Sequence, residues 1–265
     1  MTLGADLVML AVDEHQGTLS QTRQLAFALA GAELVDLARL RRIAATPEAR
    51  VKVTESLGTG DPVLDATLHA LSSSDDGLLL EDVVAIHLPD RIARQVTALL
   101  DAGELSGRAI TTTLGGQPTY YGLRPADPLR RQKLIERLAA AAEWREDLAL
   151  EAFGALVHIT GLSSATLRRG QRRARRRLED LARRFGETWR YLPGCPPELV
   201  LDRDDLAPGQ VHPQQEQPWR LAVLLAVEEA GRRVAALPRP SQGGGGLDRD
   251  VANAANLNWA LRHGA

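Results

Sequence analysis

Residues 20–43, SQTRQLAFALAGAELVDLARLRRI, determine the fold. Between Leu25 and Val35 this stretch carries a single charge, Glu33, and its apolar residues do not keep to one stripe. A helix that is apolar on nearly all sides must be buried on nearly all sides. The stretch is also too short and too interrupted to span a bilayer, which needs about 20 consecutive apolar residues. We therefore predict a central buried helix in a mainly α-helical domain.

The composition is that of an ordinary globular protein, with 44% hydrophobic and 25% charged residues in a chain of 265. The net charge of -2 argues against a protein that binds nucleic acid over its whole surface. Cys195 is the single cysteine, which excludes an intramolecular disulfide and favours a reducing cytoplasm. Because the first residues lack a basic segment and carry Asp6 within an apolar run, we expect no signal peptide.

The rest of the chain alternates helical patterns with polar turns. Asp61 and Pro62 form a standard helix start, a capping acid followed by proline. Pro89 has no amide donor, so the helix around it either kinks or restarts there. The predicted helices cover residues 2–12, 62–71, 78–102, 127–146, 148–162, 166–185 and 219–237. A strand is predicted at residues 50–54, and a β-hairpin pairs residues 109–113 with 118–123 around Leu114-Gly115-Gly116.

These patterns indicate one main domain followed by an extension. We expect a helical domain over residues 1–190 and an irregular Pro- and Gly-rich segment over 191–218. A C-terminal helix at 219–237 and a flexible tail at 238–265, which begins with a Gly-rich linker, follow.

The sequence contains no constellation typical of catalysis. The histidines are scattered without metal-ligand spacing, and no H-E-x-x-H motif is present. Residues 58–61, Gly-Thr-Gly-Asp, lack the Gly-Lys-Ser/Thr that holds phosphate in a P-loop. We therefore predict no catalytic residue, no metal ligand and no cofactor.

One predicted helix, residues 166–185, combines an apolar seam with a dense arginine surface. Arginine presents a planar fork that suits phosphate, so this helix could bind anionic lipid headgroups or nucleic acid. Alternatively, its arginines pair with the chain's own acids, including those of residues 198–205. The predicted basic surface consists of Arg168, Arg169, Arg172, Arg173, Arg175, Arg176 and Arg177.

The order of motifs resembles the Golgi phosphoprotein 3 family, which has many bacterial members. The matching pieces are TLGADLVMLAVDEHQG, LAFALAGAELVDLARLRRI, TGDPVLDATL, VTALLDAGEL with the hairpin after it, ADPLRRQKLIERL and ALVHITGLSSATL. They cover residues 2–185 in the family's order and with similar spacing. Lysine is limited to Lys52 and Lys133, an arginine bias that fits a high-GC bacterial genome.

The resemblance implies a mostly helical fold around the central helix, with one β-hairpin. It also implies a non-enzymatic peripheral membrane adaptor, since eukaryotic members bind phosphatidylinositol 4-phosphate and the cytoplasmic tails of Golgi glycosyltransferases. A cytoplasmic location, with peripheral contact at the inner face of the membrane, follows from it. The family hairpin helps self-association, a role that here falls to Leu114, Tyr120 and Tyr121.

The family's headgroup pocket uses a tryptophan and arginines. By alignment the tryptophan position falls at Gln21 or Thr22, and the arginine positions fall at Ala30, Pro89 and Ile92. The arginines beside these positions, Arg23, Arg91 and Arg94, are predicted to contact the headgroup instead.

Two functions therefore compete. The first is an adaptor that binds an anionic phospholipid, with a phosphatidylinositol 4-phosphate-like headgroup, or a protein partner, and that could form homo-oligomers through the hairpin. The alternative is a nucleic-acid-binding regulator, because residues 78–123 also resemble a winged helix. Against the alternative, its recognition helix would offer only Arg91, Arg94 and Gln95, fewer side chains than base readout usually needs.

Overall fold

The computed structural model describes residues 2–19, 22–46, 48–74, 76–85, 88–108, 121–140, 147–167, 170–186 and 218–237. Residues 1–235 form one compact unit, and residues 236–265 form a second, of which only 236 and 237 are described. The predicted tail at 238–265 and nearly all of the predicted irregular segment at 191–218 therefore lie outside the described residues.

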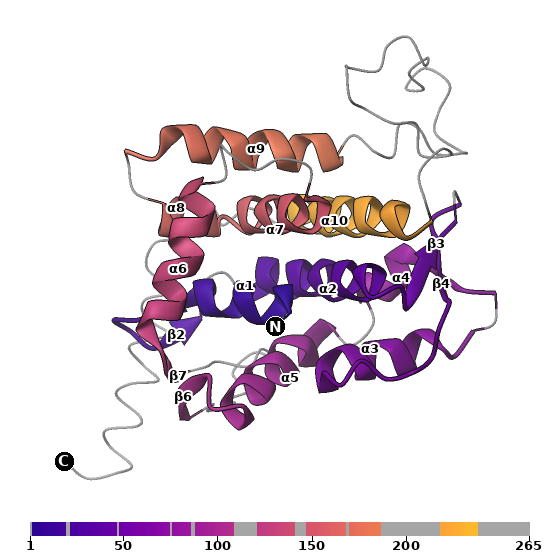
Figure 1. Cartoon of the computed structure of the whole chain (residues 1–265), viewed down its shortest axis with the longest axis horizontal. Coiled ribbons are helices and arrows are strands. Elements are labelled where there is room, and N and C mark those ends of the chain that lie inside the picture. Colours follow the sequence, from indigo (N-terminus) through magenta and orange to yellow (C-terminus); the bar gives the residue numbers. More distant parts are fainter. Residues whose placement is uncertain are drawn as a thin grey trace. The chain divides into compact units, whose positions relative to one another are not determined.

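The fold is mainly α, as predicted (Figure 1). The described helices are α1 (Leu3–Ala11), α2 (Thr22–Arg39), α3 (Pro62–Leu71), α4 (Leu80–Ala85), α5 (Leu88–Asp101), α6 (Pro128–Ala139), α7 (Leu148–Ile159), α8 (Leu162–Thr166), α9 (Arg172–Gly186) and α10 (Pro218–Ala236). The strands are β1 (Val12–Asp13), β2 (Thr18–Leu19), β3 (Ile43–Ala45), β4 (Arg50–Val53), β5 (Leu78–Leu79), β6 (Leu105–Arg108) and β7 (Tyr121–Pro125).

The predicted central helix is α2, and other helices cover it on several sides. It contacts α1, α3, α4, α5 and α7, and Leu29, Leu34 and Val35, which point to different sides of the helix, are each at most 1% exposed. Figure 1 shows α9, then α7 with α10, then α2 as successive layers of this unit. The absence of a single apolar stripe in α2 thus reflects burial all round.

Gly31 allows α7 and α10 to approach the middle of α2 closely. A Cβ atom at this position would lie 3.1 Å from Leu156 Cδ2 of α7 and 3.2 Å from the carbonyl oxygen of Ala226 of α10. Since real Cβ atoms rarely approach so closely, the missing side chain is what allows α10 to pack here. Almost every described side chain of α10 from Leu221 to Ala230 is buried, so this helix belongs to the core of the first unit.

Three helices begin at aspartate caps. The Asp61 carboxylate accepts the amides of Val63 and Leu64 at 2.9 and 3.1 Å and fixes the start of α3 where it was predicted. Asp127 and Asp147 cap α6 and α7 in the same way. Such caps satisfy amide groups that the first helical turn leaves without partners.

The structure corrects the start of the helix predicted at residues 78–102, because Leu78 and Leu79 form β5, which pairs with β4. The rest is divided into α4 and α5, and of the two predicted alternatives at Pro89 the restart is confirmed. Pro89 lies in the first turn of α5, where its missing amide costs nothing. The strand predicted at 50–54 is β4, and it is the middle strand of a β3-β4-β5 sheet whose outer strands the sequence did not reveal.

Of the predicted hairpin, only residues 121–123 are described, and they belong to strand β7. The paired strands in the described residues are β6 and β7, which carry buried Leu105 and Leu123, whereas residues 109–120 lie outside the description. Gly17 lies in the turn between β1 and β2, which connect α1 to α2. Its carbonyl oxygen accepts a hydrogen bond from the Leu123 amide at 2.9 Å and so joins β7 to this turn. These leucines therefore fix the register of the described pairing.

Candidate functional site

Helix α9 presents a basic surface on a buried seam. Ala174, Leu178, Leu181 and Phe185 are buried, and α9 packs mainly against α7. The predicted amphipathic helix is therefore present, although it begins at Arg172 rather than at Thr166, because α8 ends at Thr166 and an extended Leu167 follows it. Arg168 and Arg169 of the predicted surface lie outside the described residues.

Several arginines of α9 hold the fold together. Arg177 donates to the Glu151 carboxylate of α7 at 3.0 Å, and Arg184 donates to its other oxygen. Arg175 donates to the carbonyl of Leu167, and Arg183 pairs with Asp180 at 2.6 Å. Three of these four arginines thus pair with the chain's own acids, whereas Arg175 is held by a backbone carbonyl. The acids of residues 198–205 lie outside the described residues.

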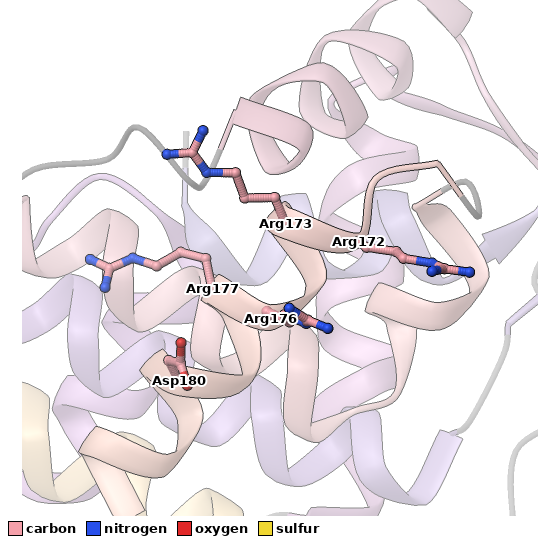
Figure 2. A pocket seen from close by; sticks show the side chains of 5 residues that line it. All are labelled: Arg172, Arg173, Arg176, Arg177 and Asp180. Carbon is pink, nitrogen blue, oxygen red and sulfur yellow. The ribbon is translucent and has the colours of Figure 1, made fainter.

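Arg172, Arg173 and Arg176 are different. All three are exposed, and none has an ionic or hydrogen-bonding partner among the described residues. With Arg177 and Asp180 they line a shallow hollow on the first two turns of α9. Figure 2 shows Arg172 and Arg176 pointing to one side of the helix and Arg173 and Arg177 to the other, as their four-residue spacing requires.

This arrangement is unfavourable unless an anion is present. Like charges one turn apart repel each other, and cations at the start of a helix oppose its dipole. A bound phosphate would relieve both effects, and guanidinium groups can hold phosphate through two parallel hydrogen bonds. The patch can therefore attract anions, and because its charges are exposed, that attraction depends on the salt concentration.

Arg91 lies in the core rather than at the surface. Its side chain is 2% exposed and pairs with Glu33 of α2, which is 1% exposed. Thr67 of α3 donates to the same carboxylate oxygen at 2.6 Å. Burial raises the pKa of Glu33, while the Arg91 charge and the Thr67 hydroxyl oppose that shift. Because its guanidinium joins α5 to α2, Arg91 is not available to a headgroup in this structure.

The structure separates the other two predicted headgroup residues. Arg23 is exposed in the first turn of α2, and Arg94 is half-buried in α5. Arg94 lies within electrostatic reach of Glu33, whereas Arg23 is ten residues, or about 15 Å along the helix axis, from Glu33. Of the positions aligned with the family arginines, Ala30 and Ile92 are buried, 1% and 4% exposed. The side chains of Gln21 and Pro89 lie outside the described residues.

The same burial weighs against the winged-helix alternative. Helix α5 would be the recognition helix, yet Arg91 and Gln95 are only 2% and 3% exposed. A recognition helix must present such side chains to base edges in a groove. Only Arg94 of the three predicted contacts is even partly accessible.

The predicted self-association residues are mostly beyond the described part of the chain. Leu114 and Tyr120 lie within 109–120, and Tyr121 pairs with Arg108 through the backbone of β7, with its side chain outside the description. Among the described residues, no group of histidine, cysteine and acidic side chains has the arrangement of a metal site. No described helix is long and apolar enough to cross a membrane.

Sequence reasoning missed a second charged feature. A cleft between α1, α2, α6 and α7 is lined by Arg39, Arg130, Lys133 and Arg137. The sequence did carry a signal for this cleft. Arg130, Lys133 and Arg137 are spaced at i, i+3 and i+7, which places them on one face of a helix.

Comparison with known families identifies the chain's relatives. The model of the family described as Golgi phosphoprotein 3 (GPP34) matches residues 3–214, most of the described structure. No curated protein matches the chain.

Proposed function

Because the chain belongs to the Golgi phosphoprotein 3 (GPP34) family, we propose that it is a non-enzymatic peripheral membrane adaptor that binds anionic phospholipid headgroups. The observation that carries this proposal is a group of exposed arginines at the start of α9 that have no partner among the described residues: Arg172, Arg173 and Arg176. The alternative of a nucleic-acid-binding regulator has no support beyond the pattern of residues 78–123.

The geometry of the patch suits a membrane surface better than an enclosed ligand. The hollow is shallow, its three free arginines fan outward on both sides of α9, and the helix is held from below by α7. Cations spread over an exposed surface in this way can contact several headgroups at once. Each basic residue near an anionic membrane contributes about 1 kcal/mol of attraction, so three give weak, reversible binding.

The family resemblance adds a more specific ligand. A phosphatidylinositol 4-phosphate-like headgroup would bring two phosphates, and Arg23 and Arg94 are the remaining predicted contacts for it. A protein partner, and homo-oligomers through the hairpin, belong to the same adaptor role. In this proposal the protein works on the cytoplasmic side of the membrane.

Liposome co-sedimentation tests the proposal. Neutral vesicles, vesicles with phosphatidylglycerol or cardiolipin, and vesicles with phosphatidylinositol 4-phosphate would each be measured at low and high salt. We expect pelleting with any anionic vesicle that weakens at high salt, since attraction between exposed charges is screened over about 8 Å at physiological ionic strength. Pelleting with phosphatidylinositol 4-phosphate alone would favour a specific headgroup site at Arg23 or at Arg94, and no pelleting would refute membrane binding.

A further inference from the structure

We propose that the cleft between α1, α2, α6 and α7 is a second binding site, specific for a phosphate group carried on a small organic moiety. The cleft encloses about 510 Å³, which lies within the range of small-molecule sites, about 300–1,000 Å³. It shares no lining residue with the arginine patch of α9, so it can be tested separately from the proposed membrane function.

The acids of the cleft already have partners. Asp127 accepts the Leu129 amide at 2.9 Å, and Asp147 accepts the amides of Ala149 and Leu150 at 3.1 Å, so both serve as helix caps. Asp6 is buried and faces Arg130 at 3.6 Å. Arg130 in turn pairs with Glu104 at 2.5 Å.

The remaining cations of the cleft make no direct contact with an acid. Arg39, at the end of α2, and Lys133 and Arg137, one turn apart on α6, make no ion pair or hydrogen bond within the described part of the chain. Arg137 lies within electrostatic reach of Asp6, and Arg39 within that of Asp36. Four cations thus line the cleft against three carboxylates, and three of those cations, from two helices, have no direct partner among the described residues.

A further feature favours a phosphate ester over another anion. Leu3, Leu134, Ala149 and Leu150 supply an apolar part of the wall, against which a carbon skeleton can pack. The cations would hold the phosphate while this wall contacts the organic part.

The test is titration calorimetry of the full chain with glycerol 3-phosphate and inorganic phosphate, at constant ionic strength. The variants are Lys133→Gln/Arg137→Gln and Arg39→Gln. Arg131→Gln is the matched control, because Arg131 lies on α6 but pairs with Glu14 at 3.4 Å outside the cleft. An Arg172→Gln/Arg173→Gln/Arg176→Gln variant separates this site from the proposed membrane surface.

We expect saturable 1:1 binding, tighter for glycerol 3-phosphate than for inorganic phosphate. It should weaken about tenfold or more in each cleft variant and stay unchanged in the control and the α9 variant. If these soluble probes do not bind, the same variants are tested by co-sedimentation with the anionic vesicles described above, and binding that the cleft variants lose would identify a lipid headgroup as the source of the phosphate. No binding to any of these probes, or equal weakening by Arg131→Gln, would overturn the site.

Discussion

At the scale of single residues, a buried ion pair contributes to the stability of the helical core. Glu33 and Arg91 form an ion pair inside the helical core, and Thr67 completes it. Breaking such a pair from one side leaves an uncompensated buried charge, whereas replacing both partners with apolar residues is often tolerated. Arg91 therefore contributes to the packing of α5 on α2.

We predict that Arg91→Met lowers the free energy of unfolding by about 3–5 kcal/mol. The double variant Glu33→Met/Arg91→Met should recover most of that loss. Urea unfolding followed by circular dichroism measures both. An unchanged midpoint for the single variant would show that the pair does not form.

A second buried acid gives a pH-dependent stability. Asp36 of α2 accepts the Leu3 amide at 2.7 Å, and burial raises the pKa of its carboxyl to about 7. In the unfolded chain that pKa is about 3.9, so between the two values the native state holds a proton that the unfolded state has lost. The stability contributed by this group is therefore full below about pH 4 and declines as the pH rises towards 7, by at most about 1.4 kcal/mol per unit.

The variant Asp36→Asn can accept the same amide without titrating. We expect its unfolding free energy to fall less steeply with pH than that of the original chain between pH 4 and 7. Urea midpoints at several pH values compare the two slopes. Parallel curves would mean that Asp36 titrates normally.

At the scale of elements, the sequence predicted helices well and their partners poorly. Local signals such as Asp61-Pro62 located α3 to the residue, because a capping acid and a proline act within one turn. β3 and β5 are short, and their pairing with β4 depends on distant segments that no local pattern records. The amphipathic pattern of α9 was evident, but which of its arginines are free depends on Glu151 and Asp180.

Gly31 tests whether α10 is an integral element. We predict that Gly31→Val lowers stability by about 1–3 kcal/mol through overpacking, because the added atoms would meet Leu156 and Ala226. Limited proteolysis should also cut α10 sooner in this variant. If both stability and cleavage were unchanged, α10 would not be docked on α2 in solution.

At the scale of the whole molecule, the chain has a formal net charge of -2, yet cations are in excess locally, at the start of α9. The helical core fixes α9 in place. Four of its arginines have partners within the fold, although Arg183 and Arg184 stay exposed, and the three at its start have none among the described residues. The sequence predicted the basic helix but not this division, since ion pairs across helices depend on the three-dimensional packing. The headgroup residues drawn from family resemblance were less well predicted, because burial of Arg91 depends on Glu33 58 residues away.

The central claim is that the free arginines of α9, rather than net charge, hold the protein on anionic membranes. The most direct test compares co-sedimentation of Arg173→Gln/Arg176→Gln with that of Arg131→Gln/Arg183→Gln on phosphatidylglycerol vesicles. Both double variants lose two charges, but Arg131 and Arg183 are already paired with Glu14 and Asp180. We predict that binding falls about thirtyfold in the first variant, from two contacts of about 1 kcal/mol each, and hardly changes in the second. Equal losses in the two variants would contradict the claim.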